Sequence, residues 1–151
     1  MKKFRFPLRS VATVRGLAEL KAREQFSLAV QAFATAEQRL RAARTRLQEH
    51  EKVLRDGRSG AFRAADQVGF LRAYKEETDR AATLEAEAVT ARSAMETARQ
   101  AWLESRRDVR VIENLEAKAR LAHRAEVERE SQNAMDDRAS AQAARATAAQ
   151  P

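Results

Sequence analysis

A heptad pattern of apolar residues runs through the middle of the chain. Steps of alternately four and three residues from Leu84 to Ile112 meet an apolar series in which only Ser105 is polar. This spacing is typical of a coiled-coil seam, the stripe along which two helices interlock. The steps extend backwards to Phe70, so we expect one unbroken helix along the series. The full series is Phe70, Tyr74, Glu77, Ala81, Leu84, Ala88, Ala91, Met95, Ala98, Trp102, Ser105, Val109 and Ile112.

A matching seam precedes it in the chain. Large residues recur every seven positions at Phe26, Phe33, Leu40, Leu47 and Leu54, with Ala22, Ala29, Ala36 and Ala43 at the intervening positions. Alanine in every heptad lets two antiparallel backbones approach closely, whereas parallel dimers usually combine Ile or Val with Leu. We therefore predict an all-α fold, a long antiparallel two-helix coiled-coil hairpin that is monomeric because its seams satisfy each other.

Glycine and proline set the expected boundaries. Pro7 suits the first turn of a helix, and Gly57 suits a left-handed helix end. We predict one hairpin domain over residues 1–138, with helix 1 at about 7–55, a turn at about 56–61 and helix 2 at about 62–138. The alanine-rich residues 139–151 offer nothing large to dock and should fray. A seam position i should face position 117 − i, which places Leu47 near Phe70, Phe26 near Ala91 and Arg15 near Trp102.

The hairpin arms are expected to be unequal. Residues 1–6 should form a short extended lead, in which Phe4 and Phe6 have no obvious local seam. Leu8, Val11, Val14 and Ala18 form an apolar stripe. This stripe is in register with the later seam only if the heptad pattern is interrupted near residues 18–22. Residues beyond about Arg110 should overhang the shorter arm as an unpaired C-terminal helix.

The charge is positive and uneven. The 151 residues carry a net charge of +7, and residues 1–60 contain 14 Lys and Arg against 6 Asp and Glu. Four arginines gather at Arg39, Arg41, Arg44 and Arg46. They indicate either a solvated helix face or a contact surface for an anionic partner. No base-stacking aromatic pattern accompanies them, so nucleic acid is not the expected partner.

The remaining composition limits compartment and chemistry. The chain has no cysteine, no apolar run long enough for a signal peptide and no segment of about 18 apolar residues. We expect a soluble cytoplasmic protein. His50 and His123 lie on different arms, a two-helix hairpin has no pocket that would desolvate paired carboxylates, and no phosphate-binding motif occurs. We expect no enzyme activity, no cofactor and no metal.

Two aromatic residues near the turn have two readings. Phe70 and Tyr74 lie close together on a thin hairpin that cannot cover both fully, so they serve as core residues or as partner contacts. Trp102 is read as a packing residue of the seam.

Both ends of the chain resemble one protein family. The beginning Phe4-Arg5-Phe6-Pro7-Leu8, followed by Val11, Val14-Arg15 and Glu19, is similar to the N-terminal signature of the flagellar export protein family FliJ. The run from Arg106 to Glu116, followed by Glu126, Glu128-Arg129-Glu130 and Gln132, resembles the second half of that pattern. Asn114 and Ala117 depart from it, because basic residues are frequent at those places in the family.

The resemblance implies a non-catalytic stalk of the type III export apparatus at the cytoplasmic face of the inner membrane. Its implied partners are a hexameric flagellar export ATPase, a membrane export-gate protein and export chaperones. With the expected overhang, it assigns Phe4, Phe6, Arg106, Arg107 and Arg110 to the ATPase ring. It assigns Leu40, Leu47, Phe70 and Tyr74 to the gate. The alternatives are the equivalent stalk of a virulence secretion system, or a generic basic coiled-coil scaffold or nucleic-acid-binding protein.

Overall fold

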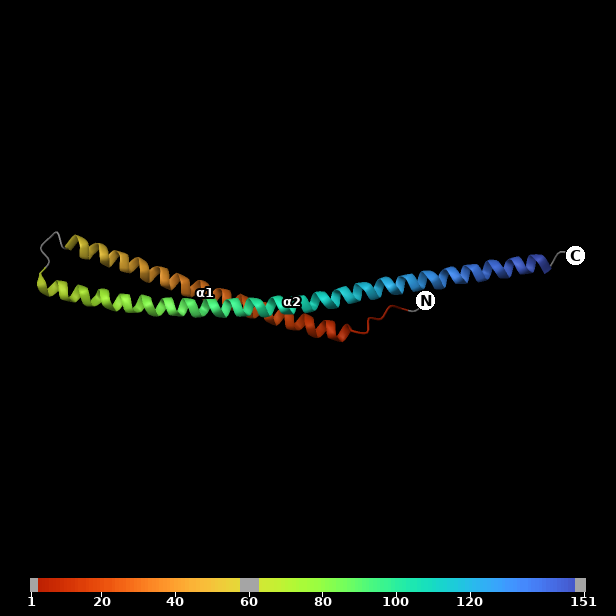
Figure 1. Ribbon diagram of the computed structural model, residues 1–151, viewed down its shortest axis with the longest axis horizontal. Coiled ribbons are helices and arrows are strands. Elements are labelled where there is room, and N and C mark those ends of the chain that lie inside the picture. Colours follow the sequence, from red (N-terminus) through yellow and green to blue (C-terminus); the bar gives the residue numbers. More distant parts are fainter. Residues whose placement is uncertain (1–2, 58–62, 149–151) are drawn as a thin grey trace. The chain divides into compact units, whose positions relative to one another are not determined.

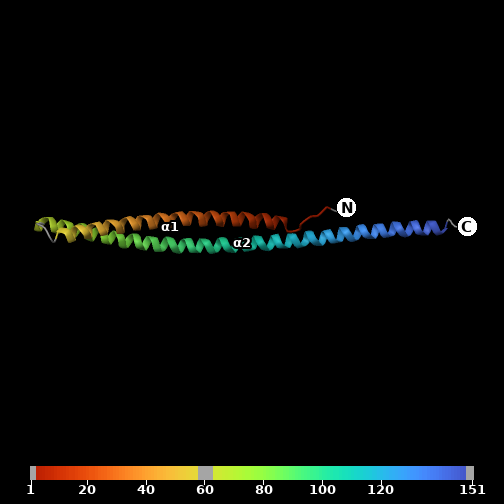
Figure 2. The same ribbon diagram turned by 90° about the horizontal axis from the view of Figure 1, so that it is seen from above.

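Two long helices make up the protein. The computed structural model describes residues 3–57 and 63–148, in which α1 spans Arg9–Gly57, α2 spans Ala64–Ala148 and no strand occurs. The chain divides into two compact units. The terminal unit comprises residues 1–18 and 106–151, and the turn unit comprises residues 19–105. The predicted all-α hairpin fold is confirmed, since α1 packs antiparallel against α2 in the turn unit (Figures 1 and 2).

The turn unit contains both predicted seams. Every seam residue of α2 from Phe70 to Ser105 is buried or half-buried, and so is every seam residue of α1 from Ala22 to Leu54. The most deeply buried are mainly alanines, namely Ala22, Ala43, Ala81 and Ala88, together with Leu40. No large side chain among the described residues is fully buried. The core is therefore a line of small side chains between two closely spaced backbones.

The pairing of the two arms differs from the expected pairing by roughly one heptad. Phe26 stacks on Trp102 rather than lying near Ala91, and Phe70 lies against His50 rather than near Leu47. Arg46 reaches Glu77, and Arg15 reaches Asp108 rather than Trp102. A seven-residue pattern looks the same after a shift of seven, so it cannot distinguish these pairings. The expected pairing rested on a turn at about residues 56–61, and Asp56 and Gly57 of that segment are helical.

The end of α1 lies later in the chain than expected, which moves the pairing in the observed direction. Asp56 and Gly57, expected in the turn, are still helical, and α2 is first described as helix at Ala64. No glycine among the described residues has a positive φ, so Gly57 does not form the left-handed helix end that was expected. The rest of the predicted turn, residues 58–61, lies outside the described residues.

In the terminal unit the buried face of α1 is not the expected one. Leu8, Val11 and Val14 are exposed, at 37%, 38% and 64%, and Ala18 is exposed too. Ala12 and Gly16 are half-buried instead. Position 12 lies one heptad before Glu19 and two before Phe26, so the later seam continues towards the N-terminus and the predicted interruption of the heptad pattern near residues 18–22 is wrong. The sequence favoured Leu8, Val11 and Val14 because they are larger and more apolar. The smaller neighbours Ala12 and Gly16 are the residues on the covered side of the helix.

The lead before α1 also packs against α2. Pro7 precedes the helix in a turn in which the Arg9 N–H donates to the Phe6 carbonyl at 3.4 Å. Phe6 is 9% exposed, and the Phe4 ring lies 5.5 Å from the His123 ring. The lead thus covers α2 as far as His123, beyond Arg110, where the overhang was expected to begin.

The C-terminal part of α2 has no covering element. Side chains 128–145 are all exposed. The helix continues to Ala148, through the first ten residues of the segment in which fraying was expected, and the high helix propensity of alanine accounts for its helical form. No helix in the described part of the chain is long and apolar enough to cross a membrane.

The alanine seam leads to a first prediction. Ala43 is 0% exposed, whereas its neighbour Ala42 points to solvent. Ala43→Leu should push the backbones apart and destabilise the fold by about 1–3 kcal/mol, because a tightly packed interface has no room for a larger side chain. Ala42→Leu should leave the melting temperature unchanged, since leucine and alanine have similar helix propensities. Thermal unfolding followed by circular dichroism tests the pair, and equal effects of the two substitutions would contradict a close-packed seam.

Candidate partner-binding surfaces

An aromatic cluster lies between the helices near the turn. The rings of His50 and Phe70 are 5.5 Å apart and tilted by 55°. Both side chains are half-buried, and the His50 Nδ1 atom is buried without a hydrogen-bond partner. Phe70 is therefore partly a packing residue that joins α2 to α1, and its remaining exposed surface is what could contact a partner.

Tyr74 lies one helical turn further along α2. Its hydroxyl donates to a Glu51 carboxylate oxygen at 3.1 Å, so it too links the two helices. This hydrogen bond and the nearby negative charge raise the pKa of Tyr74 above its usual value of 10.0. The side chain is half-buried, with its ring held in place by the hydroxyl. A half-covered, positioned aromatic ring has the character of an interface anchor.

The two leucines of the predicted gate surface differ from each other. Leu40 is only 8% exposed and belongs to the core of the turn unit. Leu47 is half-buried. Of the four predicted residues, Leu47, Phe70 and Tyr74 retain surface for a contact, and Leu40 does not.

The run of arginines on α1 makes ion pairs. Arg46 Nε lies 2.6 Å from Glu77, Arg44 lies 3.0 Å from Glu85, and Arg41 lies 3.0 Å from Glu37 on its own helix. The first two pairs bridge α1 and α2. Glu77 is a seam residue whose side chain is 16% exposed, and the hydrogen bond from Arg46 lowers the pKa of its carboxyl group. Arg44 and Arg46 therefore use their positive charge to connect the two helices, rather than leaving it free for an anionic partner.

Trp102 marks the other end of the turn unit. Its ring stacks on Phe26 at a centroid distance of 5.6 Å with 9° between the planes. Its indole N–H donates to Glu19 at 2.7 Å, which satisfies the polar atom of a half-buried side chain. The predicted packing role agrees with these contacts, although the facing residues are Phe26 and Glu19 rather than Arg15. The sequence pattern did not predict the contact between Trp102 and Glu19, because a glutamate is usually expected at the solvent-exposed surface.

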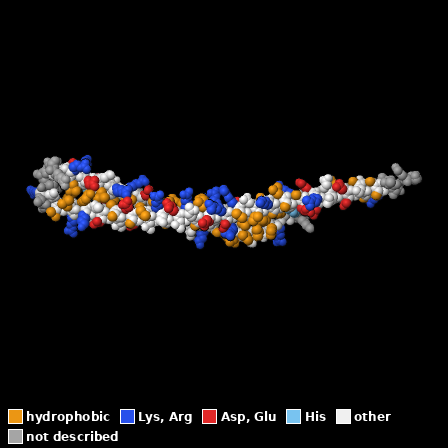
Figure 3. Space-filling view, in the orientation of Figure 1, with side chains coloured by type: hydrophobic (Ala, Val, Ile, Leu, Met, Phe, Trp, Pro, Cys, Tyr) orange, Lys and Arg blue, Asp and Glu red, His pale blue; other side chains and the backbone are white. Residues whose placement is uncertain are grey.

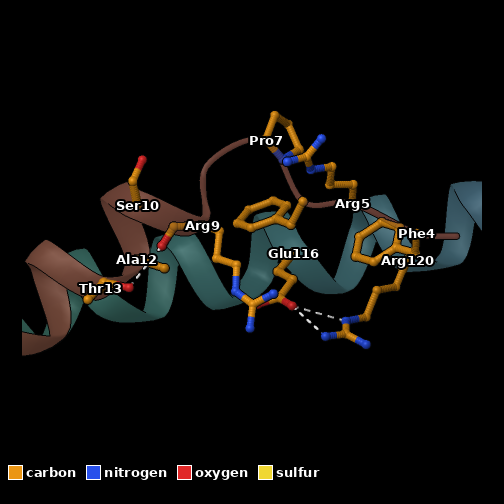
Figure 4. A pocket seen from close by; sticks show the side chains of 10 residues that line it. Phe4, Arg5, Pro7, Arg9, Ser10, Ala12, Thr13, Glu116 and Arg120 are labelled. Carbon is orange, nitrogen blue, oxygen red and sulfur yellow. Dashed lines mark hydrogen bonds and ion pairs between the residues drawn. The ribbon is translucent and has the colours of Figure 1, made fainter.

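The lead forms the most elaborate contact of the terminal unit. The guanidinium of Arg120 lies 5.2 Å from the centroid of the Phe4 ring, and the same side chain is ion-paired with Glu116 (Figure 4). A hollow is lined by residues 4–7 of the lead, by the start of α1, and by Glu116 and Arg120. Phe4 and Phe6, both expected at the ATPase ring, hold the lead on α2, and Phe4 keeps part of its surface.

The three arginines that were assigned to the ATPase ring follow on α2. Arg106, Arg107 and Arg110 are all exposed. They belong to the terminal unit, as do Phe4 and Phe6. All five residues assigned to the ATPase ring therefore lie in one unit. Among the described residues, no group of three or more His, Asp or Glu side chains could hold a metal ion.

Comparison with known protein families settles the family. The family model described as Flagellar FliJ protein matches residues 4–148, which span the lead and both helices. The chain belongs to the FliJ family. The match extends through the middle of the chain, where the sequence shows only a heptad pattern. FliJ proteins are non-enzymatic components of flagellar protein export, and the chain is accordingly a flagellar export-related protein. Searches of curated proteins and of solved structures returned no match.

The pKa of Glu77 gives a second prediction. Because folding lowers this pKa, the contribution of Glu77 to stability is fully present above the usual value of 4.5 and is lost as the pH falls through the lowered value. Between pH 6 and pH 3, the wild-type chain should therefore lose more stability than Arg46→Gln, which is already less stable at pH 6. Urea unfolding at each pH measures the difference.

Arg72→Gln is the control for this experiment. Arg72 pairs with Glu76 on the same helix, and both side chains are largely exposed, at 83% and 70%. Exposed pairs of this kind contribute little to stability. The pH dependence of this variant should follow that of the wild type. A wild-type pH dependence in Arg46→Gln would show that the bridge to Glu77 is unimportant.

Proposed function

We propose that this FliJ-family chain is a stalk that couples a hexameric flagellar export ATPase to a membrane export gate. It works at the cytoplasmic face of the inner membrane and has no catalytic residues of its own. The observation that carries the proposal is the family match over residues 4–148, which covers both helices of the hairpin. The same match favours the flagellar system over a virulence secretion system.

The terminal unit is the proposed ring-binding end. Residues 3–18 contain four Lys and Arg and no Asp or Glu, and Arg106, Arg107 and Arg110 add three exposed guanidinium groups. Exposed positive charge of this density suits acidic loops around a central channel. Contacts between exposed charges are long-range and salt-sensitive, which suits a shaft that must turn or shift between subunits rather than bind one of them permanently.

The proposed mechanism is allosteric. A hairpin has no rotational symmetry, so it presents different side chains to the different subunits of a ring. Subunits that contact different side chains have different free energies in each nucleotide state, and the stalk thereby biases their ATPase cycle. In the turn unit, the half-covered surface of Leu47, Phe70 and Tyr74 is the proposed gate contact. Escort of export chaperones is the third proposed role, and it rests on the family alone.

A basic nucleic-acid-binding coiled coil is a weaker candidate. Three of the four clustered arginines, Arg41, Arg44 and Arg46, are engaged in ion pairs with glutamates. Phosphate binding would have to break these pairs or compete with them. No observation favours this function over export.

The ring-binding end can be tested by charge reversal. Replacement of Arg106, Arg107 and Arg110 by glutamate should abolish stimulation of the cognate export ATPase, because three attractive contacts become repulsive. The melting temperature should change little, since all three side chains are exposed. The measurement is ATP hydrolysis by the purified ATPase with increasing stalk concentration, at low and at physiological ionic strength.

A matched variant controls for net charge. Replacement of Arg55, Arg63 and Lys75 by glutamate makes the same change in total charge within the turn unit, where all three side chains are also exposed. This variant should stimulate the ATPase normally. If it fails to stimulate while the first variant succeeds, the orientation of the stalk is the reverse of the one proposed.

The gate surface is tested at Tyr74. Tyr74→Ala should weaken binding to the cytoplasmic part of the gate protein by about thirtyfold or more, since truncation of an aromatic anchor at a binding hot spot costs about 2 kcal/mol or more. Leu71→Ala, at a neighbouring position of α2 that is 50% exposed, should bind almost normally. Calorimetric titration measures both affinities, and circular dichroism measures helicity. Loss of helicity in parallel with binding would make Tyr74 a core residue only.

A further inference from the structure

The terminal unit presents a group of apolar side chains to solvent. Four of them, which we call the apolar face, are Leu8 in the turn just before α1, Val11 on α1, and Val111 and Leu115 on α2. They are 37%, 38%, 57% and 42% exposed, respectively. Figure 3 shows hydrophobic side chains gathered over the N-terminal part of α1. The sequence placed Leu8 and Val11 on the face that packs against the second helix, and more than a third of each side chain remains exposed.

An ion pair shows that these four residues lie on one side of the hairpin. Arg15 of α1 is ion-paired with Asp108 of α2. Val11 precedes Arg15 by four residues, and positions so spaced share one helix face. Leu8 lies directly before the helix, where its carbonyl accepts the Ala12 N–H at 2.9 Å, which places it one turn before Val11 and Ala12. Val111 and Leu115 follow Asp108 by three and seven residues and share its face in the same way. Because Arg15 and Asp108 meet, both faces point to the same side.

The antiparallel direction of the helices brings the four residues level with one another. Moving from Arg15 towards the N-terminus of α1 corresponds to moving from Asp108 towards the C-terminus of α2. Val11 is then beside Val111, and Leu8 is beside Leu115. α2, and the start of α1 together with the residue before it, thus carry a second short stripe next to the shared seam. This is the arrangement in which two helices receive a third helix in the groove between them.

The surrounding charge indicates what kind of helix fits. Residues 3–18 contain four Lys and Arg and no acidic residue, and residues 106–124 contain six Lys and Arg against three acidic residues. A helix entering this groove would bring its flanking side chains close to an excess of positive charge. Acidic flanks are attracted there, whereas a second copy would place one basic segment against another at the cost of like-charge repulsion.

We propose that the apolar face binds an amphipathic helix with acidic flanks, supplied by another protein, and forms a local three-helix bundle with it. The bound helix places its apolar stripe between Val11 and Val111 and between Leu8 and Leu115. Its carboxylates then lie near the arginines and lysines of the surrounding segments. This inference does not require the stalk function or the gate surface, although Arg106, Arg107 and Arg110 contribute to the positive charge on which it draws.

A synthetic peptide of about three heptads tests the proposal on the full-length chain. The probe has leucine at its seam positions and glutamate at the flanking positions, and a second peptide has lysine at the same flanks. Binding is followed by fluorescence anisotropy of the labelled peptide at low salt. The glutamate peptide should bind, and the lysine peptide should bind at least about tenfold more weakly because its charges meet like charges.

Paired variants locate the site. Val11→Glu with Val111→Glu should weaken binding of the glutamate peptide at least about tenfold, because each substitution puts a negative charge into the groove. Leu28→Glu with Val89→Glu is the matched control. It changes one residue on each helix, at sites 60% and 65% exposed outside the apolar face, and makes the same change in charge. The control should bind the glutamate peptide as the wild type does.

Four results would overturn the proposal. The first is no binding of the glutamate peptide to the wild-type chain, and the second is equal binding of both peptides, which would indicate apolar adhesion without charge selection. The third is equal weakening in both double variants. The fourth is a wild-type dimer in sedimentation equilibrium that Val11→Glu with Val111→Glu converts to monomer, since a second copy would then be the occupant of the face.

Discussion

The fold depends on how closely two helix backbones can approach. A hairpin of two helices has no further layer to bury its side chains, and even its seam residues are mostly half-covered. Small residues resolve this difficulty, because Ala22, Ala43, Ala81 and Ala88 are buried and let the two backbones approach each other closely. The apolar area buried per residue is small, so the pairing must extend over many turns to be stable.

A uniform apolar seam does not by itself fix which heptad of α1 faces which heptad of α2. In this protein, polar contacts with a defined partner do so. Arg46 with Glu77, Arg44 with Glu85, Tyr74 with Glu51 and Trp102 with Glu19 each join one place on α1 to one place on α2. A slip by seven residues would break all of them at once, while the apolar seam would lose little. The charged residues therefore contribute to the specificity of the fold more than to its total stability.

Sequence alone predicted the helix class, the antiparallel hairpin and the membership of each seam from Ala22 to Leu54 and from Phe70 to Ser105. These features are periodic and local, and period is what a sequence displays. The alignment of the two arms was missed because it depends on where α1 ends, and Asp56 and Gly57 look like turn residues although they are helical. The roles of Phe4 and Phe6 were only half seen, because the docking of an extended lead on α2 leaves no periodic signal. The exposed Val11 was missed since Ala12 and Gly16 carry weaker apolar signals than the valines beside them.

The aromatic composition of the turn unit has a practical consequence. The chain contains a single tryptophan and a single tyrosine, and each of them makes a hydrogen bond across the two helices. Trp102 bonds to Glu19 at one end of this unit, and Tyr74 bonds to Glu51 towards the other. Tryptophan emission can be excited separately from tyrosine and shifts when the indole ring becomes hydrated. The natural protein therefore carries two distinguishable optical reporters, one for each end of the paired region, and opening of either end can be observed without attaching a dye.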